Sequence, residues 1–104
     1  MKVAVCDDNR EFCEKERTTI KDVFKQYFQG EDCQVDIYND GQTIISNYSD
    51  NAYDMVFLDL ELGDENGFDI AEQIVLMNND AIIILLHLMR IWFMKHSDSD
   101  RLGI

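Results

Sequence analysis

A continuous apolar run, Met-Val-Phe-Leu at positions 55–58, stops abruptly at Asp59. A strand that is apolar on both faces is typical of the middle of a parallel sheet covered by other layers on both sides. Similar runs occupy positions 3–6 and 81–86, and apolar residues alternate with polar ones around positions 35–37. The pattern therefore predicts four strands of one parallel sheet.

Helical spacing of apolar residues fills the intervals between these strands. Residues 11–29 predict a first helix, with Cys13, Ile20, Val23, Phe24, Tyr27 and Phe28 on its inner face and Gly30 as its C-terminal cap. Residues 42–48 predict a short second helix. Asn66 is placed to cap a third, whose inner face is Ile70, Ala71, Ile74 and Val75. The βαβαβαβ order implies an α/β fold with helices on both faces of a parallel sheet.

The last part of the chain does not continue this pattern. Residues 88–95 have the length of one more helix, but their apolar side chains surround it on all sides, and residues 97–104 carry no signal for a regular element. We therefore expect a core domain at residues 1–86 and an aberrant apolar tail at residues 87–104. A fifth strand and a last helix are expected to be missing.

Charge and composition exclude several classes of function. The 104 residues carry 21 acidic and 9 basic side chains, a net charge of −12, which argues against binding of nucleic acid or an anionic membrane by this chain alone. No apolar run approaches the roughly 20 residues that span a bilayer. Three cysteines form no CxxC pair, so we expect a reduced, cytoplasmic protein in which they pack as small apolar groups.

Acidic residues gather at the predicted ends of two strands. Asp7 and Asp8 follow the first strand, Asp59 ends the third, and Glu61 stands two residues further on. Parallel sheets bind ligands at the carboxyl ends of their strands, and clustered carboxylates repel one another unless a cation or a proton neutralises them. Mg²⁺ is the natural partner, and such a site suits phosphoryl transfer to a carboxylate. The alternative is that Asp7, Asp8 and Asn9 only cap the first helix and Asp59 only closes a turn.

Two segments resemble the receiver domain of bacterial two-component response regulators. They are Val-Ala-Val-Cys-Asp-Asp-Asn at positions 3–9 and Tyr-Asp-Met-Val-Phe-Leu-Asp-Leu-Glu-Leu at positions 53–62, followed by Asn66-Gly67-Phe68. The Cys-Asp-Asp-Asn and Phe-Leu-Asp-Leu-Glu motifs are similar to the subclass usually fused to a LytTR-type DNA-binding domain. The resemblance covers about four fifths of the chain.

This resemblance implies a flavodoxin-like (CheY-like) fold and a phosphoacceptor role for Asp59, with a sensor histidine kinase as donor. It also implies that Asp7, Asp8 (chiefly Asp8) and Asp59 bind Mg²⁺, with the backbone carbonyl of Glu61 as a further ligand. Gly63 in the acceptor loop stands where the family usually has proline. Asn66 and Gly67 complete that loop. The implied protein is a signalling domain rather than an enzyme.

The sequence departs from the family after the fourth strand. The family has a Thr or Ser at the strand end, where this chain has Leu86 and His87, and a Lys beyond the fifth strand that this chain lacks. If the coding sequence from about Leu86 onward is read from the third base of each codon, a suitable choice of codons encodes a Thr-Ser pair and an amphipathic helix. We therefore hypothesise a frameshift. The uncovered edge of the fourth strand predicts a homodimer or swapped assembly through that edge and the tail.

Two other functions stay open. A degenerate receiver would keep the fold and act only as a protein-interaction module. A phosphatase of the haloacid-dehalogenase type would use Asp59 as nucleophile, but it needs a second Asp where Glu61 stands and leaves the Asp7–Asp8 pair unexplained. His87 and His96 have no metal-ligand spacing around them and are expected to be incidental.

Overall fold

The structure is a computed structural model that describes residues 1–49, 52–78, 80–87 and 90–94. Its elements in chain order are β1 (Lys2–Cys6), α1 (Arg10–Tyr27), β2 (Gln34–Tyr38), α2 (Gly41–Asn47), β3 (Met55–Asp59), β4 (Glu61–Leu62), β5 (Glu65–Asn66), α3 (Gly67–Met77), β6 (Ile82–His87) and β7 (Arg90–Met94). The three helices predicted between the strands are confirmed, the first two with shifts of one or two residues at their ends. The small β4–β5 hairpin was not predicted.

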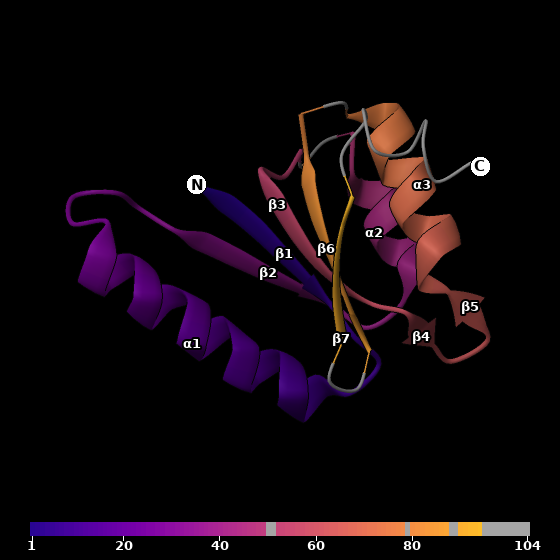
Figure 1. Cartoon of the computed structure of the whole chain (residues 1–104), viewed down its shortest axis with the longest axis horizontal. Helices are drawn as coiled ribbons and strands as arrows, with labels where there is room; N and C mark the ends of the chain where they lie inside the picture. Colours follow the sequence, from indigo (N-terminus) through magenta and orange to yellow (C-terminus); the bar gives the residue numbers. More distant parts are fainter. Residues whose placement is uncertain (50–51, 79, 88–89, 95–104) are drawn as a thin grey trace.

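A five-stranded sheet in the order β2-β1-β3-β6-β7 forms the centre of the molecule. The four predicted strands β1, β2, β3 and β6 are all parallel, with Val3, Met55 and Ile82 side by side in register. Helix α1 lies on one face of the sheet, and α2 and α3 lie on the other (Figure 1). The α/β class with helices on both faces of a largely parallel sheet is confirmed.

The larger core lies between the sheet and the α2–α3 layer. All four residues predicted for the inner face of α3 are buried there: Ile70, Ala71, Ile74 and Val75. Leu58 and Leu85 face them from the sheet with no exposed surface. The 3/4 spacing of the third helix therefore predicted its packing correctly, because this helix covers the middle of the sheet.

The α1 side is less well covered. Of the residues predicted for the inner face of α1, only Cys13 is buried, whereas Val23, Tyr27 and Phe28 are 43%, 69% and 49% exposed. That part of the prediction is wrong, because α1 packs mainly on β1 and β2 and its second half leaves apolar side chains in water. No helix among the described residues is both long and apolar enough to cross a membrane.

The positions of the three cysteines fit the expectation that they pack as small apolar groups. Cys6 and Cys13 are buried, Cys33 is half-buried, and all three thiols are free. Burial, followed by the nearby Asp7 carboxylate, raises the pKa of the Cys13 thiol to about 11. A thiol held protonated in this way is a poor nucleophile, so Cys13 is a packing residue.

Residues 90–94 form a strand, and the expected helix over residues 88–95 is wrong within the described part of that range. β7 runs antiparallel to β6, with Leu85 opposite Trp92 and Leu86 opposite Ile91. The segment pairs with the free edge of β6, where its backbone groups replace water as hydrogen-bond partners. The edge expected to be exposed is therefore covered by the chain itself, and a fifth strand is present with the opposite orientation. Residues 88, 89 and 95–104 lie outside the described part.

Candidate metal and phosphoryl site

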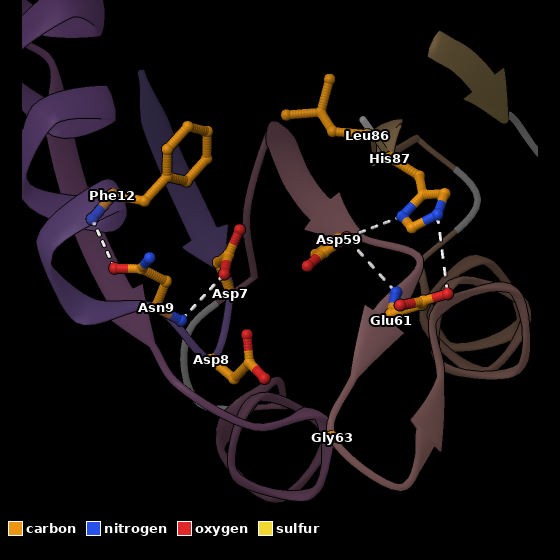
Figure 2. A pocket seen from close by; sticks show the side chains of 9 residues that line it. All are labelled: Asp7, Asp8, Asn9, Phe12, Asp59, Glu61, Gly63, Leu86 and His87. Atoms are coloured by element: carbon orange, nitrogen blue, oxygen red, sulfur yellow. Dashed lines mark hydrogen bonds and ion pairs between the residues drawn. The ribbon is translucent and has the colours of Figure 1, made fainter. Parts of the chain in front are cut away.

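The carboxyl ends of β1, β3 and β6 meet around a pocket of about 490 Å³ (Figure 2). Its lining residues are Asp7, Asp8, Asn9, Phe12, Asp59, Glu61, Gly63, Leu86 and His87. One carboxylate oxygen from each of Asp7, Asp8 and Asp59 lies within 4.8 Å of the other two. The structure thus brings together the three aspartates that the strand ends predicted.

In the loop after β1, one residue caps helix α1 and the two residues before it line the pocket. The Asn9 side chain caps α1 by accepting a hydrogen bond from the Phe12 N–H at 3.0 Å. Asp7 Oδ1 accepts from the Asn9 N–H at 2.8 Å, and the Asn39 side chain donates to the Asp7 carbonyl at 2.9 Å. Helix capping therefore accounts for Asn9, whereas the Asp7 and Asp8 carboxylates face the pocket.

Asp59 ends β3 and begins the loop that leads into the β4–β5 hairpin. Its Oδ1 accepts a hydrogen bond from the Glu61 N–H at 3.3 Å, so the expected turn does form. Gly67 lies directly behind it: a Cβ there would come within 2.3 Å of the Asp59 carbonyl oxygen and 2.6 Å of the Leu60 Cα. The Gly67 N–H also donates to the Leu60 carbonyl at 2.7 Å. Only glycine allows α3 to begin this close to the end of β3.

The remaining loop residues set the shape of the hairpin. Gly63 has φ +60° in the turn between β4 and β5, a conformation that glycine adopts without strain. The Asn66 side chain caps α3 by accepting from the Phe68 N–H at 2.8 Å, as predicted. Glu65 accepts from the Gly41 N–H at 2.8 Å and so ties the hairpin to the start of α2.

The pocket concentrates negative charge. Burial raises the pKa of Asp7 to about 6, with Asp59 and Asp8 adding to the rise and the Asn9 N–H opposing it. Burial, together with Asp7 and Asp59, also raises the pKa of Glu16 on α1 to about 7. A compact set of hard oxygen donors whose mutual repulsion is uncompensated fits Mg²⁺. Asp7, Asp8 and Asp59 are the residues that would hold the ion.

His87 has a position that the sequence did not reveal. Its Nδ1 lies 3.9 Å from Asp59 Oδ1 and its Nε2 lies 3.5 Å from Glu61 Oε1 (Figure 2). The expectation that His87 is incidental rested on spacing along the chain, whereas the contacts come from strand pairing. Leu86 is the register partner of Asp59, so the next residue, His87, lies beside the acceptor loop. A signal was available: an imidazole at the end of the strand next to Asp59.

The profile of the response regulator receiver domain family matches residues 3–90. The chain belongs to this family. Receiver domains are signalling modules of two-component systems, and the acidic pocket of this chain lies where the β1 and β3 motifs of the family converge. A search of curated protein sequences found no significant relative.

Solved receiver structures share the fold. The receiver domain of DrrB, solved in a BeF3-activated form, is 24% identical over 86% of this chain and 67% of its own length, with a TM-score of 0.68. The receiver domain of a modulated diguanylate cyclase from Desulfovibrio desulfuricans G20, described as an example of alternate folding, is 16% identical. It covers 98% of this chain and 73% of its own length with a TM-score of 0.67.

RcsB from Salmonella enterica serovar Typhimurium, solved bound to promoter rprA with BeF3, is 19% identical with a TM-score of 0.65. The match covers 82% of this chain and 46% of RcsB. The chain thus spans from about half to about three quarters of these three structures. At these identities the likeness establishes the fold alone.

Proposed function

We propose that this receiver domain accepts a phosphoryl group on Asp59 from a sensor histidine kinase, in a Mg²⁺-dependent step. The observation that carries the proposal is the convergence of the Asp7, Asp8 and Asp59 carboxylates within 4.8 Å at the carboxyl edge of the parallel sheet. Family membership supports the same role. The proposed acceptor lines the pocket with a side chain that is 20% exposed, so a phosphodonor can reach its carboxylate.

The transfer is a single displacement at phosphorus. An Asp59 carboxylate oxygen forms the new O–P bond while the P–N bond of the donor phosphohistidine breaks, and the leaving imidazole nitrogen keeps the electron pair. Bound Mg²⁺ would neutralise the phosphoryl oxygens, and Asp7 and Asp8 would hold it together with Asp59 and the Glu61 backbone carbonyl. The Glu61 N–H orients the Asp59 carboxylate through its hydrogen bond to Oδ1.

A protein-interaction module without phosphorylation is the second candidate. Of the nine described residues that line the pocket, none is Lys, Ser or Thr, and Leu86 occupies the register position beside Asp59. Preorganised positive groups and donors contribute much of the rate of such transfers. We therefore expect phosphorylation to be slow compared with a receiver that has both groups.

Incubation with acetyl phosphate, with and without Mg²⁺, tests the proposal by intact-protein mass. The purified chain should gain one phosphoryl group in the presence of Mg²⁺, and the gain should disappear in Asp59→Asn. Asp64→Asn is the matched control, because Asp64 is an exposed carboxylate in the β4–β5 turn outside the aspartate cluster. A gain retained by Asp59→Asn contradicts the assignment of the acceptor.

Two other outcomes identify the alternatives. Absence of any mass gain in the unaltered chain favours the interaction module. Continuous release of phosphate from many donor molecules favours the phosphatase, in which Glu61 would have to act as acid and base. The side chain of Glu61 is 75% exposed to solvent, which does not favour that role. A receiver is not expected to turn over substrate beyond loss of its own phosphoryl group.

We expect this chain to be cytoplasmic, with a sensor histidine kinase and a second copy of the chain as its partners. A second copy of the chain would bind to the α1 side of the sheet, because β7 covers the β6 edge. Met55 and Phe57 are half-buried on that side, and Ile91 is 63% exposed. Light scattering at micromolar concentration should give the mass of a dimer; a monodisperse monomer contradicts it. A membrane or nucleic acid is not an expected partner of this chain alone.

We further propose that the chain is of the LytTR-associated subclass, whose longer members carry a DNA-binding domain and regulate transcription. A frameshift from about Leu86, which would make residues 87–104 an aberrant tail and not a separate domain, belongs to the same proposal. Its support is the departure from the family motifs at Leu86 and the antiparallel course of β7. Sequencing the coding DNA across residues 85–104 decides it, and an uninterrupted frame shared by close relatives contradicts it.

A further inference from the structure

His87 holds an imidazole between two acidic side chains at the mouth of the pocket. Nδ1 faces Asp59 at 3.9 Å, Nε2 faces Glu61 at 3.5 Å, and the His87 side chain is 30% exposed. Both separations exceed the 2.7–3.2 Å of an ordinary N–H···O hydrogen bond. Nδ1 therefore makes no direct hydrogen bond to Asp59 and is available to an acceptor atom that lies beside both groups.

Strand pairing fixes the position of this ring. β6 pairs with β3 along its length, with Leu86 opposite Asp59, and the Leu86 carbonyl accepts a hydrogen bond from the Leu60 N–H at 3.0 Å. On its other side, His87 pairs with Arg90 of β7. The backbone that carries His87 is thus held on both sides next to the acceptor loop. A side chain on such a support loses little conformational freedom when it binds a ligand.

A phosphoryl group on Asp59 would need a hydrogen-bond donor on the β6 side of the pocket. A phosphoryl group on Asp59 brings additional negative charge and three strong acceptor oxygens next to the Asp7 and Asp8 carboxylates. Among the nine described residues that line the pocket, His87 is the only one with a basic side chain, and its neighbour Leu86 offers no side-chain donor. Of the described side chains at the end of β6, His87 is thus the one that can donate to the phosphoryl group.

We propose that His87 donates a hydrogen bond from Nδ1 to a phosphoryl oxygen on Asp59. The inference rests on the proposed phosphoacceptor function. His87 forms no covalent bond: the O–P bond forms at Asp59, the donor's bond to phosphorus breaks, and the leaving group keeps the electron pair. The pairing of β6 with β3 and β7 places the ring so that Nδ1 faces Asp59.

The test compares His87→Ala, His87→Asn and His87→Gln with the unaltered chain. Asn places its amide N–H₂ where Nδ1 stands, whereas Gln places its amide nearer to Nε2 and Glu61. The initial rate of Asp59 phosphorylation by acetyl phosphate with Mg²⁺ should fall roughly ten- to a hundredfold in His87→Ala, at or below the lower limit of the cost of removing one oxyanion donor. Asn should recover most of the loss and Gln little of it.

Lys25→Ala is the control for loss of a basic residue, because Lys25 lies in the last turn of α1, away from the pocket. Its rate should match that of the unaltered chain, and circular dichroism should show that all variants fold. As a second readout, the ¹⁵N signal of His87 Nδ1 should shift when BeF3⁻ and Mg²⁺ are added together. A signal that does not move while Asp59 is occupied overturns the contact.

The possible failures are distinguishable. If the unaltered chain becomes phosphorylated and His87→Ala matches or exceeds its rate, the role of His87 is overturned and the phosphoacceptor function stands. If Asn is no better than Ala, the assignment of the bond to Nδ1 is overturned. If the unaltered chain takes up no phosphoryl group, both proposals are overturned together.

Discussion

The pocket has two sides of different origin. The carboxylate side, formed by Asp7, Asp8 and Asp59 at the ends of β1 and β3, carries the oxygen donors expected of a receiver. The histidine side, formed by Leu86 and His87 at the end of β6, carries one apolar side chain and one imidazole. The first side follows the family motifs residue by residue, and the second departs from them.

The two sides also differ in how they are supported. Local structure builds the carboxylate side: Asn9 caps α1, Asn66 caps α3, and Gly67 permits close packing behind Asp59. The histidine side depends on β7, a strand that pairs antiparallel with the edge of β6. Loss of Mg²⁺ binding on the carboxylate side and loss of the support that β7 gives to the histidine side are therefore expected to occur independently. Four perturbations test the two sides.

Gly67→Ala should have the largest effect, because the added Cβ would meet the Asp59 carbonyl and the Leu60 backbone, neither of which can move without displacing β3. We expect a loss of about 3 kcal/mol or more in the free energy of unfolding, the upper end of overpacking costs. Urea denaturation measures it. Gly63→Ala is the matched control: its Cβ meets nothing within 4 Å, so only the positive φ costs stability, by about 1–2 kcal/mol. Equal losses in both variants would show that the Gly67 contact is relaxed in solution.

Trp92→Ala should weaken the histidine side without changing the carboxylate side. Trp92 packs against the main core, and its ring meets Phe68 edge-on with centroids 6.2 Å apart. Half burial predicts a loss of about 2 kcal/mol in unfolding free energy, below the range for a fully buried aromatic. Ile91→Ala, at a side chain that is 63% exposed, should change stability by less than about 0.5 kcal/mol. An equal loss in the two variants would contradict the strand position of residues 90–94.

Asp8→Asn should weaken Mg²⁺ binding and leave stability unchanged, the reverse of what we expect for Trp92→Ala. Removing one of three clustered carboxylates should weaken Mg²⁺ binding at least about tenfold, since even residues that only support a metal ligand cost this much. Isothermal titration calorimetry measures the affinity, and the unfolding free energy without Mg²⁺ should not fall. Trp92→Ala, provided that it is folded at the assay temperature, should bind Mg²⁺ as the unaltered chain does. Loss of affinity in Trp92→Ala would show that the two sides are coupled.

The smallest expected effect is a pH dependence of stability. The folded-state pKa of Asp7 is raised from 3.8 to about 6, so the folded chain holds this proton more tightly than the unfolded chain. The associated stability is present below about pH 4 and lost as the pH rises through 6, by under about 1 kcal/mol after screening by solvent. Asp7→Asn should remove this part of the slope in urea denaturation without Mg²⁺. Mg²⁺ should bind more tightly at pH 7 than at pH 5, and identical slopes in both chains would contradict the raised pKa.

The carboxylate side could be predicted because it depends on residues that are close in sequence. An apolar run that stops at Asp59 fixes a strand end, and parallel strands bring such ends to one edge whatever the rest of the chain does. The inner face of α3 was predictable for a similar reason, since Ile70 and Ile74 repeat at helical spacing over the middle of the sheet. The exposure of Tyr27 could not be predicted, because it depends on how far α1 extends beyond the strands that it covers.

Sequence by itself determined the βα order, the parallel strands and the aspartates at their ends, because apolar periodicity and helix caps act over a few residues. Only the tertiary structure decided the course of residues 90–94 and the place of His87. An apolar segment satisfies burial as either helix or strand, and the free edge of β6 selected the strand by offering backbone partners. The contacts of His87 with Asp59 and Glu61 follow from the register between β3 and β6, a relation between residues more than twenty positions apart.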